Sequence, residues 1–315
     1  TGITGCFKGL STDDPFTLDI DLVNCRTSTK GIGDVLTSVT GGKTALPSNI
    51  PDVRGILNVC MKGPLDDLRV KADLDSDAGT MAAVVDIDNL TAKDSLLRIG
   101  GKISTEDLDI SRLIGRNLVH QCTADATLHA TMRGKDGPEG TIDTLSVNRL
   151  NINEYDYSNI LATGSLSSRR FNGRIISHDP NFNFLFQGIF TFSPKTNNAL
   201  YQFYANIGLA DLHALNFDQR ENSTVSLTTN ANFNRTGNGV LLGNIDVNNI
   251  RLTNDDEKHN IGNIHISSRS TEDQYRANIT SSFIEAAYFG TGSYSDFMHD
   301  IIGITAKREM PSLFR

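Results

Sequence analysis

The sequence predicts a mainly β protein: an elongated, curled antiparallel sheet that forms a repeating groove with an apolar inner face. Three observations carry this prediction. Apolar residues recur at every second position in many stretches, turn-forming residues separate those stretches, and helical patterns are few. Successive side chains of a strand point to opposite faces, so the alternation is typical of strands with one apolar and one polar face. Strands of a parallel sheet would instead read as continuous apolar runs.

The alternation begins near the N-terminus, where Phe16, Leu18 and Ile20 are separated by Thr17 and Asp19. Further strands are predicted at 70–74, 81–87, 182–192, 201–209, 245–247, 264–266 and 275–279. Combinations of Asn, Asp, Gly and Pro predict turns, because these residues adopt the backbone angles that tight turns need. The predicted turns are at 135–137, 171–173, 179–181 and 236–239.

The strongest alternation is in the segment 181–193. Its five phenylalanines are all at even positions: Phe182, Phe184, Phe186, Phe190 and Phe192. An unbroken strand here would present one face of phenyl rings. The segment is longer than the usual strand of about 5–6 residues, so we expect one long strand or two strands joined near Gly188. The rings line something apolar, which is either the protein's own core or a foreign ligand.

Helical signals are found at two places. Residues 106–117 are compatible with a short helical turn. Residues 293–309 predict a helix, because Ser293 is a favourable N-terminal cap ahead of Phe297 and Ile301. We expect this short C-terminal helix to close one end of the sheet.

A loose internal repeat divides the chain. The order of short motifs in 141–192 recurs in 239–290, which is a period of about 100 residues and suggests stacked meanders. We therefore predict an N-terminal β segment of the groove at 1–125, a repeat segment at 126–292 and a closing segment with the helix at 293–315.

Charge and hydropathy argue against nucleic-acid partners and against a membrane-spanning helix. The formal net charge is -8, and no run of Lys or Arg exceeds two residues. Nucleic-acid binding requires a basic surface, so DNA and RNA are not expected partners. No window approaches the ~18 consecutive apolar residues of a membrane helix, and the first six residues lack the order of a signal peptide. We expect a soluble fragment of a longer protein.

Motifs for nucleotide or calcium binding are incomplete. Residues 37–44 end like a phosphate-binding loop, but Thr37 stands where the first glycine is required. Asp73 and Asp75 alternate like calcium ligands, yet the closing position is Val84 instead of a glutamate. A solvated strand face explains these carboxylates better. No cofactor and no metal are therefore predicted.

Catalytic signatures are equally weak. The seven histidines have no metal-binding spacing, and no Ser or Cys lies in a recognisable nucleophile elbow. His178 precedes Asp179 in a predicted turn, where Asp179 is expected to cap the bend. Cys6, Cys25, Cys60 and Cys122 are expected to be packed or free thiols, and Cys6 with Cys25 is the pairing to test. No enzyme activity is expected.

Several short motifs follow one another in a defined order along the repeat segment. The run from Tyr155 to Ile160 is followed by Gly164-Ser165-Leu166, Phe171-Asn172-Gly173 and Asp179 to Gly188. The motifs Gly100 to Ile103 and Leu108 to Gly115 precede them. In this succession, clearest over about 85–290, the chain resembles the repeat of the translocation and assembly module subunit TamB, within the AsmA-like group, in its Bacteroidetes form.

The resemblance implies a large cell-envelope protein with an inner-membrane anchor, a periplasmic β structure and a role in outer-membrane biogenesis and protein secretion. Such proteins are thought to conduct phospholipid between the inner and outer membranes along a β groove with an apolar floor. TamB members also partner an outer-membrane barrel protein. We expect the anchor and the barrel-docking region to belong to the longer parent, which places this chain in the periplasm.

Two functional hypotheses follow. In the first, the chain is a segment of a lipid-conducting groove, and its partners are phospholipid acyl chains. The groove-lining candidates are Phe182, Phe184, Phe186, Phe190, Phe192, Phe203 and Ile207. In the second, the chain is a structural or adhesive envelope module with a closed dry core and a protein partner. The two differ in whether the phenylalanine faces are open or mutually buried.

Overall fold

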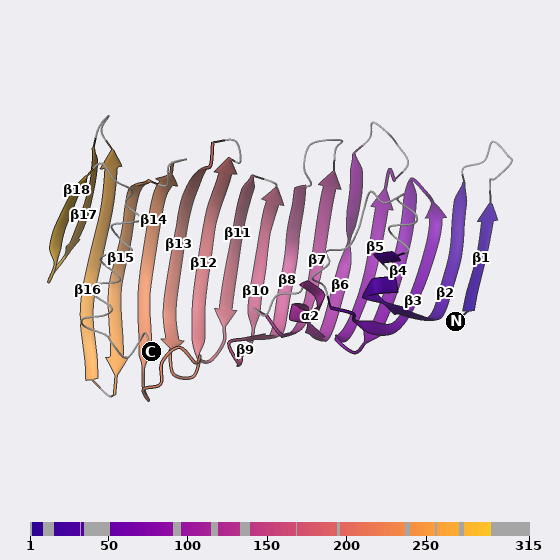
Figure 1. Cartoon of the computed structure of the whole chain (residues 1–315), viewed down its shortest axis with the longest axis horizontal. Coiled ribbons are helices and arrows are strands. Elements are labelled where there is room, and N and C mark those ends of the chain that lie inside the picture. The colour runs from indigo at the N-terminus through magenta and orange to yellow at the C-terminus, as the bar shows by residue number, and fades with distance from the viewer. Residues whose placement is uncertain are drawn as a thin grey trace. The chain divides into compact units, whose positions relative to one another are not determined.

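The computed structural model contains two compact units, Thr1–Ser168 (unit 1) and Arg169–Arg315 (unit 2). The structure describes residues 2–8, 16–31, 33–34, 51–90, 96–114, 119–132, 139–167, 169–193, 196–236, 240–255, 257–270 and 274–290. Within these ranges the protein is almost entirely β (Figure 1): it has eighteen strands, the short helix α2 (Ile110–Ile114) and a few helical residues at 29–31 and 33–34.

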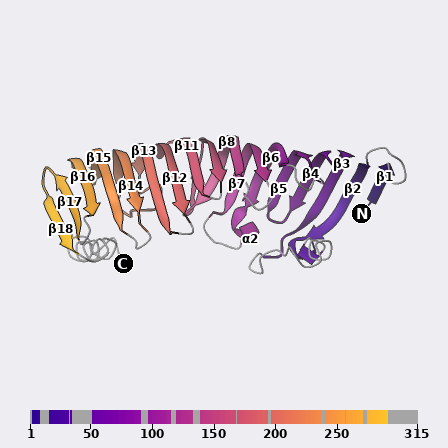
Figure 2. The same cartoon turned by 90° about the horizontal axis from the view of Figure 1, so that it is seen from above.

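Unit 1 is an antiparallel meander. Its described strands are β1 (Gly2–Lys8), β2 (Thr17–Ser28), β3 (Arg54–Pro64), β4 (Asp67–Ser76), β5 (Gly79–Asp88), β6 (Leu97–Asp109), β7 (Gln121–Met132), β8 (Glu139–Ile152), β9 (Tyr155–Tyr157) and β10 (Ile160–Ser167). From β1 to β8 each strand pairs with the next one in the chain. Both β9 and β10 pair with β8. Figure 2 shows these consecutive strands side by side.

The register of unit 1 separates an apolar face from a polar face. Residues directly opposite each other in antiparallel strands share a face. One row across the sheet is Ile20, Met61, Val70, Val85, Gly101, Leu128 and Ile142. The adjacent row on the other face is Asp19, Lys62, Arg69, Asp86, Gly100, His129 and Thr141. The alternation in the sequence thus becomes two chemically different surfaces.

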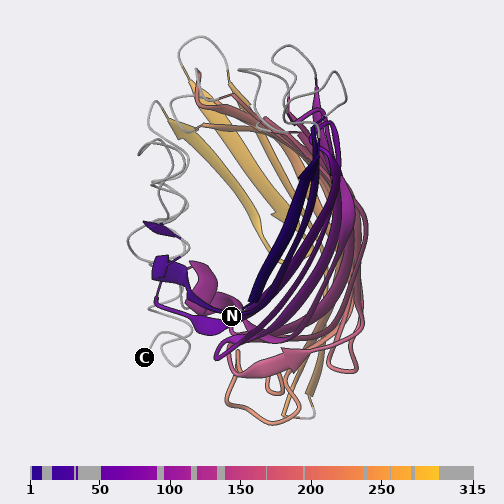
Figure 3. The ribbon, with the colours of Figure 1, turned by 90° about the vertical axis from the view of Figure 1, so that its right-hand side faces the viewer.

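The apolar face of unit 1 is its concave face. The strands of this unit are bowed along their length, and α2 lies on the inner side of the bow (Figure 3). Beside α2, Leu108 and Cys122 are buried, and the register places both on the apolar face. The concave side is therefore the apolar side.

Unit 2 is a second antiparallel meander. Its described strands are β11 (Arg170–His178), β12 (Phe182–Ser193), β13 (Asn198–Asp211), β14 (Thr224–Arg235), β15 (Leu241–Asn254), β16 (Glu257–Ser270), β17 (Tyr275–Ser281) and β18 (Glu285–Gly290). Each strand from β11 to β18 pairs with the next. An apolar row crosses it as well, through Phe186, Ala205, Thr229, Val247 and Ile264.

Bulges in several strands explain how the sheets bend. Register shifts interrupt β2, β6, β13 and β15, where two residues oppose one on the neighbouring strand. In three of these bulges a residue with positive φ, Asn24, Asp107 or Asn249, donates its backbone N–H to a side chain of the next strand at 2.8–3.0 Å. A bulge bends a strand and increases its twist, so these positions favour a curled sheet over a flat one.

Few bulky side chains are fully buried in either unit. Leu215 and Val240 of unit 2 are 1% and 2% exposed, and both lie in connections, not in the middle of a strand. Several of the other buried apolar residues are alanines. Each unit is therefore a single layer of strands, and the two most deeply buried bulky side chains, Leu215 and Val240 in unit 2, lie in connections.

The connection after β13 is held by a charged pair as well as by Leu215. The guanidinium of Arg220 donates to both carboxylate oxygens of Asp218, with Nε at 3.0 Å from each, and the hydroxyl of Ser223 donates to the same carboxylate at 2.8 Å. The Asp218 side chain is 8% exposed. The hydrogen bonds from Arg220 hold the pKa of Asp218 well below its ordinary value.

This lowered pKa predicts a pH-dependent contribution to stability. The unfolded chain protonates Asp218 near pH 4, whereas the folded chain keeps it charged to lower pH. The contribution is therefore present above about pH 4 and is lost as the pH falls toward the folded-state pKa. We expect Asp218→Asn to lower the melting temperature at pH 7 and to narrow its difference from the unsubstituted chain at pH 3. A difference that is the same at both pH values would contradict this role.

The predicted fold class is confirmed: the protein is mainly β, with curled antiparallel sheet and an apolar inner face in unit 1. The phenylalanine segment is one strand, β12, which runs through Gly188 without interruption. The turn predicted at 171–173 is wrong, because Phe171 lies within β11 and pairs with Phe190. Asn-Gly favours a turn only where the flanking residues do not find partners, and here they pair with β12.

The helical predictions are corrected in one place. Strand β6 continues to Asp109, so the helix near 106–117 covers only Ile110–Ile114. The helix predicted at 293–309, with its segment 293–315, lies outside the described residues, and so does the loop at 37–44. The division between the two units falls inside the predicted segment 126–292, and the boundaries at 125 and 292 stay predictions.

Candidate functional site

The seven residues that the sequence identifies share one face of unit 2. Phe182, Phe184, Phe186, Phe190 and Phe192 lie on β12, and Phe203 and Ile207 lie on β13. In the register of the two strands Phe184 is opposite Ile207, and Phe203 is opposite Gly188. The register of β12 and β13 shifts between Asn183 and Phe184. Phe182 nevertheless lies on the same face as Phe184, because the two rings stack on each other.

The rings of this face contact one another side by side. Phe184 lies 5.2 Å from Phe182 and 6.4 Å from Phe186, measured between ring centroids, with nearly parallel planes. Phe186 is also 5.6 Å from Phe190 and 5.7 Å from Phe203. Such pairs contribute about 0.5–1.5 kcal/mol beyond the area they bury. The rings therefore hold each other in position within one layer.

Three further aromatic residues extend the cluster. Phe171 of β11 stacks on Phe190 at 5.8 Å, Tyr201 of β13 lies 5.6 Å from Phe190, and Phe233 of β14 stacks on Tyr201 at 4.8 Å. These three and the seven predicted residues are called the aromatic face below. Tyr201 stands in the same alternation as Phe203, so the sequence contained that signal. Phe171 was missed because its Asn-Gly neighbours suggest a turn.

The aromatic face is not covered by another described element. All of its rings are partly accessible, and Phe192 is 43% exposed. The substantial contacts between described elements all join neighbouring strands, so no second sheet packs on this face. In a β-sandwich the inner faces interdigitate and exclude water. The aromatic face instead presents partly accessible rings.

The chemistry of the aromatic face suits an apolar ligand. Its ten residues contain no carboxylate, ammonium or imidazole group. The hydroxyl of Tyr201 is its one polar side-chain group, so its main physical capacity is to remove hydrocarbon from water. The corresponding face of unit 1 is aliphatic, because no aromatic residue occurs from Thr17 to Glu154.

Gly188 provides the space that the central rings occupy. A Cβ atom at this position would lie 2.6 Å from Cβ of Phe203 and 3.0 Å from Cζ of Phe186. Both distances are shorter than ordinary van der Waals contact. The ring of Phe186 and the Cβ atom of Phe203 thus lie directly over the glycine backbone.

We expect Gly188→Val to displace these two rings and to destabilise unit 2 by about 1–3 kcal/mol, the usual cost of an overpacked site. Thermal unfolding followed by circular dichroism measures the effect. Gly140→Val is the matched control, since the nearest atom to an added Cβ there is 3.6 Å away. Equal melting temperatures for the two variants would show that the rings do not pack on Gly188.

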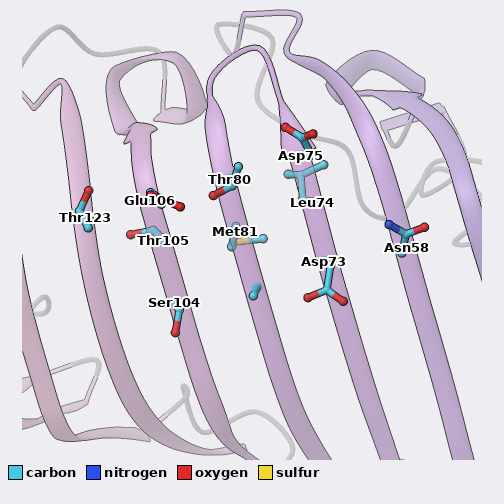
Figure 4. A pocket seen from close by; sticks show the side chains of 11 residues that line it. Asn58, Asp73, Leu74, Asp75, Thr80, Met81, Ser104, Thr105, Glu106 and Thr123 are labelled. Carbon is cyan, nitrogen blue, oxygen red and sulfur yellow. The ribbon is translucent and has the colours of Figure 1, made fainter.

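The polar face of unit 1 contains the alternating carboxylates noted in the sequence. A depression of about 570 Å³ lies there, and Figure 4 shows Asp73 and Asp75 of β4 and Glu106 of β6 among its side chains. Asp73 pairs with Lys71 at 3.6 Å. In the described ranges, no group of three His, Cys, Asp or Glu residues is arranged to hold a metal ion. The carboxylates form a charged strand face.

The turn before β12 has the role that the sequence predicts. One carboxylate oxygen of Asp179 accepts the backbone N–H of Asn181 at 2.9 Å and of Phe182 at 3.1 Å. The residue is 3% exposed. Asp179 therefore caps the bend and fixes the start of the phenylalanine strand.

The cysteines do not form the pairing that the sequence left to test. All four are free thiols. Cys6 of β1 lies opposite Asp19 of β2, whereas Cys25 of β2 lies opposite Leu57 of β3. Burial raises the pKa of the Cys122 thiol, which lies in the cluster beside α2. None of these thiols contributes to the aromatic face.

Fold and site together define a class of protein: open antiparallel sheet whose apolar face is not covered by a second layer of the described residues. Comparison with known proteins adds no name to this class, since the chain matches no family model, no curated protein and no solved structure. In the ranges that the structure describes, no helix combines the length and the hydropathy that crossing a membrane requires.

Proposed function

We propose that this protein is a segment of a hydrophobic groove that conducts phospholipid between the inner and outer membranes of a cell envelope. The observation that carries the proposal is the aromatic face: ten residues on adjacent strands form a continuous apolar surface that stays partly accessible. Large contiguous apolar patches on soluble proteins usually mark sites that bind a protein, a membrane or a ligand.

An open face fits transfer better than storage. A fully buried methylene is worth about 0.8 kcal/mol, so a completely enclosed acyl chain would be held by more than ten kcal/mol. A single layer of strands contacts an acyl chain from one side, which leaves each position weaker. Similar apolar contacts along the face then let a chain move by exchanging one contact for the next.

The second hypothesis, a structural or adhesive module, requires a closed dry core. None of the phenylalanines of unit 2 in the described ranges is buried, and the described strands of each unit form one layer. These observations favour the groove. The location in the periplasm, the inner-membrane anchor of a longer parent and the docking of an outer-membrane barrel protein remain parts of the proposal that rest on the motif order of 85–290.

Native mass spectrometry of the chain purified from a bacterial periplasm tests the proposal. We expect phospholipid to co-purify, and we expect a lipid-stripped chain to take up added phospholipid. A chain that carries no lipid and also refuses added lipid would move the assignment to the structural module.

A further inference from the structure

The last described strand of unit 2, β18, has one edge that no other described strand pairs with. It pairs only with β17, and that pairing has no register shift. Figure 1 shows it at the outer end of the unit. An edge strand presents unpaired backbone groups, and proteins usually protect such an edge with lysine, proline or a bulge. The sequence of β18, Glu-Ala-Ala-Tyr-Phe-Gly, contains none of these devices.

The backbone groups of three β18 residues point away from β17. The N–H of Ser281 donates to the carbonyl of Ile284 at 2.7 Å, which makes these two residues a hydrogen-bonded pair. Along an antiparallel ladder such pairs alternate with pairs that are not hydrogen-bonded to each other. The β18 residues of the second kind are Glu285, Ala287 and Phe289. Their N–H and C=O groups are therefore directed to the open edge.

The side chains of these three residues share the polar face, and the two ends of the strand carry opposite charges there. Phe289 is 60% exposed, and the guanidinium of Arg276, directly opposite it on β17, lies 4.9 Å from its ring centroid. Glu285, at the other end, is exposed. The small side chain of Ala287 lies between them. The edge therefore has a cation over an exposed ring at one end and a carboxylate at the other.

We infer that β18 pairs antiparallel with β18 of a second copy of this chain, about a twofold axis at Ala287. Such a contact is self-complementary, because the same residues meet in both halves. Ala287 lies opposite itself, and Glu285 of each copy lies opposite Phe289 of the other. Directly opposite residues share a face, so each carboxylate meets the Phe289 ring and the guanidinium of Arg276. This charge complementarity favours a second copy over a strand of another protein.

The contact joins the apolar faces of the two copies. A twofold axis between antiparallel neighbouring strands is perpendicular to the sheet, so corresponding faces of the two copies lie on the same side. Ala286 and Tyr288 are on the apolar side of β18, since Tyr288 is opposite the buried Ala277. In the paired strands Ala286 of one copy lies opposite Tyr288 of the other. The inference does not depend on which ligand the aromatic face binds.

Sedimentation velocity of the full chain over a range of concentrations tests the inference. We expect a dimer whose Kd rises about tenfold or more in Ala287→Pro, because this change removes two central backbone hydrogen bonds, one from each copy. The N–H of Ala287 is not used in the ladder with β17, so the variant is expected to fold.

A charge reversal tests the ends of the same contact. Glu285→Arg is expected to weaken the dimer about tenfold, because it places a second cation beside Arg276. Addition of Arg276→Glu to this variant is expected to restore part of the affinity. Glu221→Arg makes the same charge change in the exposed connection before β14, and as the matched control it should dimerise like the unsubstituted chain.

Two results would overturn the inference. An unsubstituted chain that stays monomeric at the highest concentration at which it is soluble would show that the edge of β18 binds no second copy. A dimer that Ala287→Pro leaves unchanged would place the contact elsewhere on the chain. Melting temperatures of all variants within a few degrees of the unsubstituted chain exclude misfolding as the cause. Lipid occupancy is measured separately, so neither result bears on the proposed function.

Discussion

The double substitution Phe184→Glu and Phe186→Glu is expected to remove co-purifying phospholipid while leaving the chain folded. Both rings are partly accessible at the centre of the aromatic face, so the new carboxylates can remain hydrated. An acyl chain crossing them would have to desolvate two charges, which costs several kcal/mol and lowers lipid occupancy roughly tenfold or more. Native mass spectrometry measures the occupancy.

The matched control places the same two charges on the other face of the same strand. Leu185 and Gln187 alternate with the phenylalanines of β12, so Leu185→Glu with Gln187→Glu keeps the aromatic face unchanged. We expect this variant to retain its lipid. Lipid retained by Phe184→Glu with Phe186→Glu, or unfolding of that variant, would mean that these rings belong to a core and not to a groove.

Leu215→Ala is expected to have the largest effect on stability, a loss of about 2–5 kcal/mol in the free energy of unfolding. Leu215 is 1% exposed in the connection after β13, and its backbone N–H donates to the carbonyl of Asp211 at 3.0 Å. Removal of its side chain leaves a cavity in one of the few dry clusters of unit 2. Urea unfolding measures the change.

Phe217 provides the comparison, since it lies two residues away and is 61% exposed. Phe217→Ala is expected to change the unfolding free energy by no more than about 0.5 kcal/mol. If Phe217→Ala lowered the free energy of unfolding more than Leu215→Ala, the cluster around Leu215 would not be a main source of the stability of unit 2. Together with the glutamate variants, this pair separates residues that stabilise the unit from residues that are available to a ligand.

The alternation of side chains was readable in the sequence because a strand has a strict period of two. The alternation identified the phenylalanine strand and the shared face of Phe184 and Phe203, and turn chemistry identified the cap at Asp179, without any tertiary information. Phe171 was not predicted to lie on this face, because the Asn-Gly that follows it is compatible with both a turn and a strand. Only the pairing of Phe171 with Phe190 decides between the two.

The row in which Arg235 lies could not be assigned from the sequence either. Arg235 follows Phe233 in the same alternation, but it shares a row with Ala199 and Phe192 only because β12, β13 and β14 pair in this register. Register depends on many weak contacts between strands that are distant in the chain, and a shift of one residue would move Arg235 to the other face.

The sequence by itself determined that this protein is an antiparallel β structure with one apolar and one polar side to its strands, since that follows from local period and turn chemistry. Tertiary structure alone decided that the described strands of each unit stay in one layer, that bulges such as the one at Asn249 accompany the bending, and that the most deeply buried bulky residues, Leu215 and Val240, lie in connections. The physical reason is that alternation specifies which side chains share a face, whereas cross-strand pairing and bulges determine what that face contacts.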